Sequence, residues 1–397
     1  MAEVFALRWC LTRHESSAFK LVSDAVGAAF ESVKVDPYIM NAANDSRFMS
    51  RVCDSSLRFA LFSIDSKQLA SVHGIDENVD VETLAPTLDL YRYVMMNSEK
   101  IIFLGDTIMR PLTSTEIGSA ARHIGEEKAI ELYAKVGFDA WDFSMFSMAR
   151  YNYSTKQIIE TEHPLRSDNY AAFAKKLRKV GEDNGIHCNQ SHAPFPSYAP
   201  GMFDYLKRAI ECTAIAGGKV CVIHPCNNEP KEKNAEMYHE LLPFAKEYGV
   251  KIATENMWNW NNQENHASAA ACSHHEDFLA HIKEVNDPDF VACLDIGHAE
   301  MRGLDTSARQ MILTLGDSLR ALHIHDNDRW HDSHALPFTM NIDFDEVISS
   351  LREIGYKSYF TLEADSHLSA FNADNITVGM QQMADAAHKL CDMFERI

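Results

Sequence analysis

From residue 116 onward, short apolar runs alternate with longer amphipathic stretches. Short apolar runs are typical of strands and amphipathic stretches of helices, and their regular alternation indicates repeated strand–helix units around a parallel sheet. Eight such units over about 280 residues predict a (β/α)8 TIM barrel, because that length is usual for the fold. The expected strands are residues 117–121, 138–145, 186–193, 219–224, 250–256, 290–296, 319–326 and 359–364.

The helices expected between these strands mostly stop at a glycine, which commonly ends a helix. Residues 151–167 are expected to form a long loop. The expected helices are residues 126–136, 168–184, 202–216, 234–248, 275–285, 306–317, 345–354 and 377–396.

Residues 1–113 lack the alternation, so we expect an N-terminal appendage of unknown role, itself of α/β character, ahead of a barrel at 114–397. The proline at 111 and the polar residues after it indicate a linker at 111–115. Within the appendage we expect helices at 19–32 and 83–96 and strands at 57–64 and 100–105.

Composition and charge limit the kinds of partner that the protein is expected to bind. The 397 residues are 46% hydrophobic and carry a net charge of −20, which repels phosphate backbones and argues against a nucleic-acid partner. No long apolar span or signal pattern is present, so we expect no membrane association. Nine scattered cysteines without a CxxC pair indicate free thiols, and hence a cytoplasmic protein. The sequence leaves a homo-oligomer open.

Six successive expected strands, the third to the eighth, finish in ionisable side chains. Strands of a parallel barrel end at one mouth, so these side chains are expected to converge there. Charged groups are disfavoured within strands, which makes such a series unusual for a purely structural role. The six residues are His192, His224, Glu255, Asp295, His325 and Glu363.

Three carboxylates and one imidazole among these residues form a ligand set for one divalent cation (Mn, Co, Mg or Zn). Carboxylates so close together repel one another unless a cation neutralises them. Either glutamate alone could instead pair with a basic loop residue. We expect the metal ligands to be Glu255, Asp295, His325 and Glu363.

Seven short stretches recur in the order found in one known family. They read Q-S-H-A-P-F-P (190–196), V-I-H-P (222–225), T-E-N-M-W (254–258), L-D-I-G-H (294–298), L-H-I-H-D-N-D (322–328), D-S-H-A-L-P (332–337) and F-T-L-E-A (360–364). On these stretches, residues 116–397 resemble the xylose-isomerase-like TIM barrels, a superfamily of metal-dependent sugar isomerases and epimerases. The first 113 residues have no counterpart in the resemblance.

The resemblance implies that Glu255 and Glu363 both bind the metal and move a proton on opposite sides of a substrate carbon, through a metal-bound cis-enediolate. The substrate would be a sugar, or a related polyol or keto-sugar. Asp295 and His325 would complete the ligand set, with His323 in reserve because it shares the inward parity of its strand. Residues expected to contact the substrate are His298, His192, His224, Trp258, His323, Asp332 and His334.

Three alternatives remain open at this point. A lyase or dehydratase could use the same enolate. An endonuclease-IV-like phosphoesterase with three zinc ions could use additional ligands such as His192, His224, Asp332 and His334. A metal-free binding protein could keep the barrel alone. The sequence identifies neither the sugar nor its phosphorylation state, and counting bound metal ions is the simplest way to separate these classes.

Overall fold

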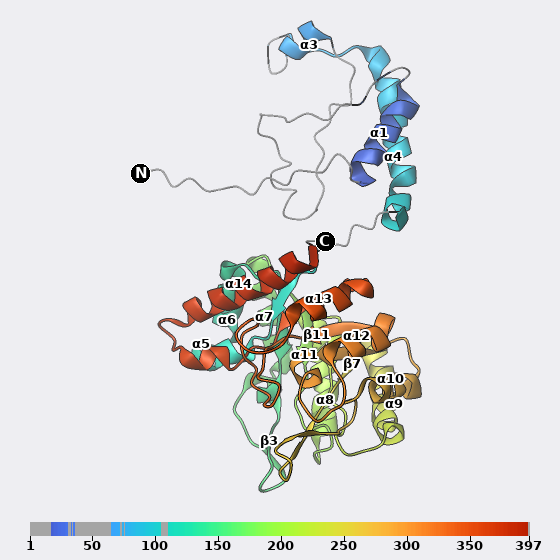
Figure 1. Cartoon of the computed structure of the whole chain (residues 1–397). Coiled ribbons are helices and arrows are strands. Elements are labelled where there is room, and N and C mark those ends of the chain that lie inside the picture. Colours follow the sequence, from blue (N-terminus) through green and yellow to red (C-terminus); the bar gives the residue numbers. More distant parts are fainter. Residues whose placement is uncertain are drawn as a thin grey trace. The chain divides into compact units, whose positions relative to one another are not determined.

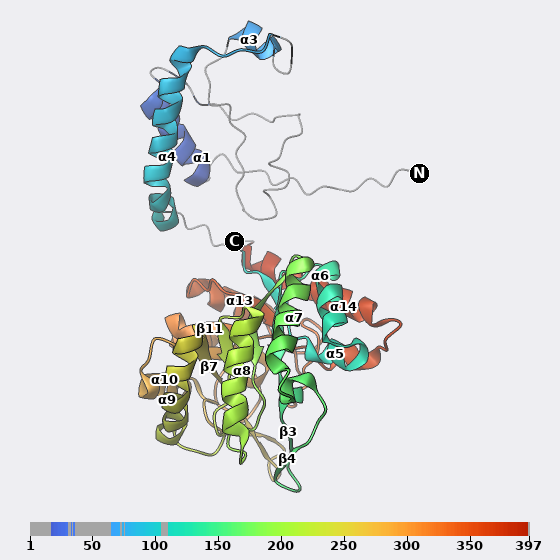
Figure 2. The same ribbon diagram turned by 180° about the vertical axis from the view of Figure 1, so that it is seen from behind.

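The structure is a computed structural model that describes residues 17–30, 33, 35, 65–71, 74, 76–104 and 110–395. The chain divides into two units, Met1–Met109 and Arg110–Ile397. Figure 1 labels the elements of each unit, and Figure 2 shows them from behind.

In the first unit, the described elements are helical. Helix α1 (Ser17–Ala29) packs against α4 (Leu84–Leu104) around buried Ala25, Val26 and Leu90. The unit also contains α3 (Ser66–Ser71) and the 3-10 turn η1 (Val81–Thr83). The prediction of a strand at 100–105 is wrong for residues 100–104, which continue α4. A short apolar run does not by itself distinguish a strand from a helix. The strand expected at 57–64 lies outside the described residues.

The second unit is a TIM barrel, as expected from the sequence. A sheet in the order β2-β5-β6-β7-β10-β11 and the pair β1-β12 are both parallel. Bridges between Glu116 and Asp142 and between Ile324 and Leu362 join the pair to the two edges of the sheet and so close the ring. The strands are β1 (Thr113–Thr115), β2 (Ala140–Ser144), β5 (His187–His192), β6 (Val220–Val222), β7 (Lys251–Glu255), β10 (Phe290–Asp295), β11 (Leu319–His323) and β12 (Phe360–Leu362).

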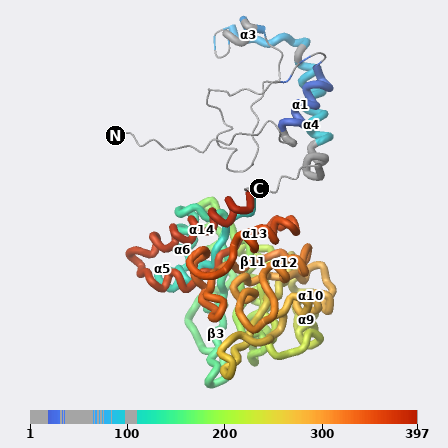
Figure 3. The backbone as a smooth tube through the Cα atoms, in the orientation of Figure 1, coloured from blue at the N-terminus to red at the C-terminus, as the bar shows by residue number. Residues whose placement is uncertain are grey.

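Helices surround this ring, and side chains alternate between its two faces. Leu294 and Leu322 pack outward in the large core under the helices, whereas Cys293 and Ala321 face the barrel interior. The chain closes on itself, because the last helix lies beside α6 (Figure 3). The helices of this unit are α5 (Gly118–Ile124), α6 (Glu126–Val136), α7 (Tyr170–Asp183), α8 (Met202–Ala216), α9 (Lys231–Tyr248), α10 (His275–Val285), α11 (Ile296–Ala299), α12 (Ala308–Leu315), α13 (Phe344–Glu353) and α14 (Ile376–Glu395).

The first barrel strand lies earlier in the chain than expected. Residues 117–121 contain the start of α5, and the expected linker at 111–115 contains β1 instead. This strand reads Thr-Ser-Thr, so it gives no hydrophobic signal. Its polar side chains have partners: Thr113 Oγ1 donates to Asp139 Oδ2 (2.8 Å) and Ser114 Oγ to Asn189 Oδ1 (2.7 Å). The Glu116 carboxylate then accepts from the Ser119 amide (3.1 Å), which favours the turn into α5.

Two hairpins and several 3-10 turns lie in the connections of the barrel. The expected loop at 151–167 contains most of the hairpin β3 (Arg150–Asn152) and β4 (Gln157–Ile159), and also η3 (Pro164–Arg166). A second hairpin is formed by β8 (Asn259–Asn261) and β9 (His266–Ser268). No described helix has the length and apolar character needed to cross a bilayer. All cysteines in the described residues are free thiols.

Candidate metal centre

The candidate site is built from the last inward-facing positions of the barrel strands. On β10, Val291 and Cys293 face the interior, and two residues further the same face carries Asp295. Ala253 likewise precedes Glu255 on β7. The apolar side chains below are small, which leaves the space above them to the larger polar groups. The alternation of the strands therefore directs successive ionisable side chains into one mouth.

The central group of the site consists of three carboxylates and one imidazole. Glu255, Asp295, His323 and Glu363 each offer a ligand atom within 4.8 Å of the others. All four are buried. The His323 Nδ1 atom lies 3.1 Å from Glu255 Oε1 and 3.3 Å from Glu363 Oε2, so the two glutamates flank a single ring nitrogen.

His325, the expected fourth ligand, lies outside this group. Strand β11 ends at His323, and His325 follows after Ile324, which bridges to β12. The His325 Nε2 atom lies 3.1 Å from Asp295 Oδ1. Its ring occupies the space above Gly297, where an added Cβ would overlap the imidazole. The reserve candidate, His323, thus takes the place beside the carboxylates.

Two further groups adjoin the central one. His192 and His224 place their Nε2 atoms 2.6 Å apart and 3.6 and 3.3 Å from Glu255 Oε2. On the other side, His298, His325, Asp332 and His334 form a group of their own. Its centre is Asp332, whose Oδ2 atom lies 3.2 Å from both His298 Nε2 and His334 Nε2. The structure thereby places every expected polar site residue in one of three neighbouring clusters.

The donor set fits a divalent cation. Several of its buried atoms make no hydrogen bond of suitable geometry within the part of the chain that the structure describes, even where an ion-pair contact is close. This is costly for polar atoms unless another partner binds them. Oxygen and imidazole donors of this kind suit Mn, Mg, Co or Zn. The atoms are Glu255 Oε2, Asp295 Oδ2, His323 Nε2, His325 Nε2 and Asp332 Oδ1.

The electrostatics of the site show how strongly these groups depend on positive charge. Burial alone would raise the pKa of Glu255, but His323 and His224 hold this pKa well below its ordinary value. Conversely, burial would lower the pKa of His298, yet Asp295 and Asp332 raise it to about 10. Despite burial, the nearby carboxylates likewise hold the pKa of His323 well above its ordinary value, so the positively charged forms of His298 and His323 are favoured beside the acids. A bound cation would supply that charge instead, so its binding should release protons.

The comparisons with known proteins identify the family of this barrel. Residues 130–396 match the model of the xylose isomerase-like TIM barrel family.

This chain belongs to the xylose isomerase-like TIM barrel family.

An uncharacterised family relative from Methanocaldococcus jannaschii is 28% identical over 239 residues, or 55% of this chain and 78% of the relative. The L-ribulose 3-epimerase of Methylomonas sp. (strain DH-1) is 21% identical over 252 residues, or 61% of this chain and 79% of that enzyme. Among solved structures, the IolI protein with a zinc atom has a TM-score of 0.52 at 16% identity, over 71% of this chain and 98% of the other. This likeness supports the TIM-barrel fold.

Two acidic residues at this mouth of the xylose isomerase-like barrel were missed by sequence reasoning. Asp142, in β2, places Oδ2 3.4 Å from His323 Nε2 and accepts a hydrogen bond from Gln190 Nε2 (2.9 Å). Glu116 follows β1 and accepts from Ser144 Oγ (2.9 Å). For Asp142 the available signal was inward parity within the expected strand 138–145, whereas Glu116 had none, because the strand before it was not expected; neither residue falls in the quoted family stretches.

Trp258 has a mixed environment. Its ring centroid lies 6.3 Å from that of His298, so it borders the site. It also packs against buried Ala267, Met301 and Leu304. The structure therefore gives Trp258 a packing role beside the hairpin β8–β9 and leaves its expected contact with substrate as a prediction.

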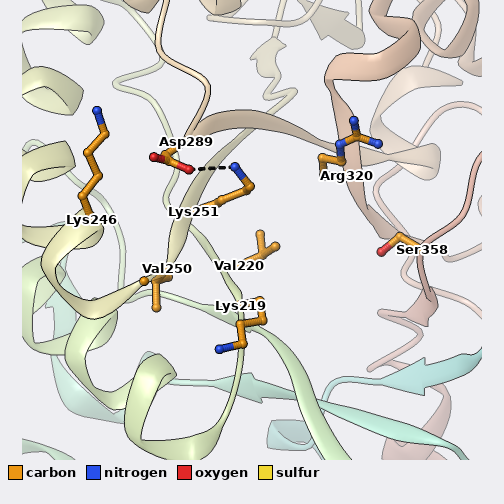
Figure 4. Close-up of a pocket in the computed structure, with 9 residues that line it drawn as sticks. Lys219, Val220, Lys246, Val250, Lys251, Asp289, Arg320 and Ser358 are labelled. Atoms are coloured by element: carbon orange, nitrogen blue, oxygen red, sulfur yellow. Dashed lines mark hydrogen bonds and ion pairs between the residues drawn. The ribbon is translucent and has the colours of Figure 1, made fainter.

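A cavity of about 460 Å³ lies at the other end of the barrel (Figure 4). Lys219, Lys251 and Arg320, which line it, stand at or beside the starts of β6, β7 and β11. Active sites of TIM barrels lie at the carboxyl ends of the strands. By this rule, the buried mouth rather than this cavity is the expected place for chemistry.

Proposed function

We propose that the protein is a divalent-metal-dependent isomerase or epimerase of a sugar or a related keto-sugar. The observation that carries the proposal is the pair of buried glutamates, Glu255 from β7 and Glu363 beside β12, on either side of His323 Nδ1. Two carboxylates that lie so near the same point suit a reaction that removes a proton and returns it. The named activity of the Methylomonas relative, a sugar epimerase, belongs to the same class.

In this proposal, Glu255, Asp295, His323 and Glu363 hold one cation, with His323 in the position first given to His325. When bound, the cation supplies Lewis acidity that polarises a carbonyl and its neighbouring hydroxyl. One glutamate then takes the proton from the adjacent carbon to give a cis-enediolate. Return of the proton to the neighbouring carbon, while the hydroxyl proton passes from one oxygen to the other, isomerises the sugar. Delivery of a proton by the other glutamate to the opposite face of the same carbon epimerises it.

The flanking imidazoles would orient the substrate. His298 is fixed by its Nδ1 atom, which lies 2.9 Å from the Asn256 carbonyl oxygen and donates to it. This leaves Nε2 on the side of Asp332, where it can meet a sugar hydroxyl. His192, His224 and His334 line the same mouth, and we assign them to substrate contact.

The proposal is tested by exchange of the proton α to the carbonyl. Ketoses and aldoses are incubated with the protein in deuterated water with Mn, Co, Mg or Zn, and NMR follows both deuterium uptake and the product. The spectra separate isomerised, epimerised and dehydrated products. We expect Glu255→Gln and Glu363→Gln each to lower exchange about 10²- to 10⁴-fold, the range for loss of a general acid or base.

Glu211→Gln is the matched control, since Glu211 lies on the outer helix α8 and bonds to Tyr170 Oη. It should exchange at the wild-type rate. Undiminished deuterium uptake in both site variants would remove the acid–base roles of Glu255 and Glu363.

A second candidate is a polynuclear phosphoesterase. It is favoured by the two histidine groups beside the central one, the first of which shares Glu255 with it. The net charge of −20 argues against a DNA substrate. Metal content per chain separates the two candidates: one ion together with α-proton exchange supports the isomerase, whereas three zinc ions with hydrolysis of a phosphodiester probe support the alternative.

A further inference from the structure

Five aromatic side chains lie in two connections beside the candidate metal centre, and we call them together the aromatic ledge: Phe146, Tyr151, Tyr153, Phe195 and Tyr198. They come from the two connections that follow β2 and β5. Phe146 lies in η2 (Phe146–Met148), Tyr151 lies in β3, and Tyr153 is at the tip of the β3–β4 hairpin. Figures 1 and 2 show this hairpin projecting beyond the helices at one end of the barrel.

The inner end of the aromatic ledge touches the site. The Phe195 ring stacks on His224 with centroids 5.0 Å apart and planes at 27°. Phe146 meets His192 edge to face at 4.8 Å and Phe195 at 5.2 Å. Whatever binds at the central carboxylates therefore has aromatic rings next to it on this side.

The outer end of the ledge is open to solvent. Tyr151 contacts Tyr153 (centroids 5.1 Å apart) and Tyr198 (6.4 Å). Tyr153 is 62% exposed, Tyr198 56% and Phe195 38%. Large aromatic rings usually bury their faces, and neighbouring rings left exposed mark a binding surface.

The composition of the ledge selects its occupant. None of its five side chains carries a charge, so it offers nothing specific to a phosphate or a carboxylate. Flat rings and phenolic hydroxyls match the two kinds of surface on a pyranose, its apolar C–H face and its hydroxyl rim. Phe195 lies against His224, and the exposed Tyr198 follows it by three residues in the same connection. A ligand that stacks on Phe195 and reaches Tyr198 therefore has its other end in the metal centre.

We propose that the aromatic ledge binds a second sugar ring, so that the substrate is a ketose joined to a further sugar rather than a free monosaccharide. This inference rests on the proposed function and names the substrate class of the same site. The reducing unit reacts between Glu255 and Glu363, and the attached ring stacks over Phe195 toward Tyr198 and Tyr153.

The experiment compares D-fructose with three disaccharides that keep fructose as a free reducing unit: lactulose, maltulose and isomaltulose. The readout is kcat/KM for α-proton exchange in deuterated water with Mn. At least one disaccharide should exceed D-fructose by ten-fold or more. Tyr198→Ala and Tyr153→Ala should remove most of that gain and leave exchange of D-fructose within two-fold. Tyr91→Ala, at a 47% exposed tyrosine on α4, is the matched control and should change neither.

The outcomes separate this inference from the proposed function. Absence of exchange with every ketose and disaccharide in the screen overturns the proposed function and the inference with it. Exchange of monosaccharides without a preference for any disaccharide, or equal losses on both substrate types in the tyrosine variants, overturns the inference alone. Light scattering tests whether a second copy of the chain covers the ledge instead of a sugar. If Tyr198→Ala converted a dimer to a monomer, the ledge would be a contact between two copies, and the sugar assignment would be overturned.

Discussion

The two ends of the barrel differ in how exposed their ionisable side chains are and in which charges meet. Strands β7 and β10 show both differences. Where β7 begins, Lys251 pairs with Asp289, just ahead of β10; their side chains are 42% and 34% exposed, and Nζ and Oδ1 are 2.7 Å apart. Where the same strands end, Glu255 and Asp295 are 1% and 0% exposed. Opposite charges meet in solvent at one end, while like charges are buried together at the other.

This difference in burial supports the proposed position of the site. An exposed pair costs little to keep and contributes little, whereas buried carboxylates are costly unless a partner stabilises them. At the carboxyl ends of β7 and β10, imidazoles lie beside the buried acids and offset this cost. Substitutions at either end of the barrel test whether this contrast holds.

The largest effect is expected from His323. Removing its ring in His323→Ala should weaken Mn binding by at least about 100-fold, more than the ~10- to 100-fold loss usual for an outer-shell residue. His325→Ala should weaken Mn binding by no more than about 10-fold, because His325 contacts Asp295 from outside the central group. Titration calorimetry of metal-free protein measures both affinities. The reverse ranking would restore His325 as the ligand.

Asp142→Asn should weaken metal binding by about 10- to 100-fold, because a carboxylate beside a ligating histidine fixes the orientation of the ring. The relevant contact is between Asp142 Oδ2 and His323 Nε2 (3.4 Å). The control residue lies three positions earlier in the chain. Asp139, just before β2, accepts from the Thr113 amide and hydroxyl at 2.8 Å.

Asp139→Asn should therefore lower stability by about 1 kcal/mol, as expected for weakened hydrogen bonds, and leave metal affinity unchanged. Calorimetry and thermal unfolding of both variants provide the two readouts. Equal metal affinity in the two variants would show that Asp142 does not position His323.

The fold could be predicted from the sequence wherever a strand is apolar. Residues 290–296 and 250–256 give clear strands, and their final acids fall at the mouth because side chains alternate along a strand. The same logic failed for β1, whose Thr-Ser-Thr side chains bond to Asp139 and Asn189. A polar strand stabilised by partners distant in sequence carries no local signal.

The site could be predicted in kind but not in detail. His323 and His325 share one parity, so the sequence alone does not choose between them. The choice depends on where β11 ends, which pairing with β12 decides. Asp142 was missed for a related reason: β2 and β11 are opposite edges of the six-stranded sheet, and they approach only when the ring closes. Contacts across a barrel follow from closure rather than from spacing.

Glu116 and Glu255 are both buried at the mouth, but their pKa values shift in opposite directions. Burial of Glu116 away from the histidine cluster raises its pKa from 4.5 to about 6. The folded state therefore holds this proton more tightly than the unfolded state, and stability falls as pH rises from about 4.5 through about 6. Glu116→Gln lacks this ionisation and still accepts hydrogen bonds.

As pH rises across this window, the free energy of unfolding of Glu116→Gln should increase relative to that of the wild type. The increase should reach about 2 kcal/mol above pH 6. Urea unfolding at a series of pH values measures the difference. Parallel pH profiles for the two proteins would contradict the role of burial.

The smallest effect is expected at the opposite end of the barrel. Exposed ion pairs contribute about 0.2–1 kcal/mol, because solvent screens them and both side chains lose freedom. A double-mutant cycle of Lys251→Ala and Asp289→Ala should give a coupling energy in that range, and 1 M salt should remove most of it, since the screening length is then only about 3 Å. Metal affinity should stay unchanged in all three variants. A coupling well above this range, or a change in Mn binding, would mean that the solvent-exposed end of the barrel is linked to the site, and the division between the two ends would not hold.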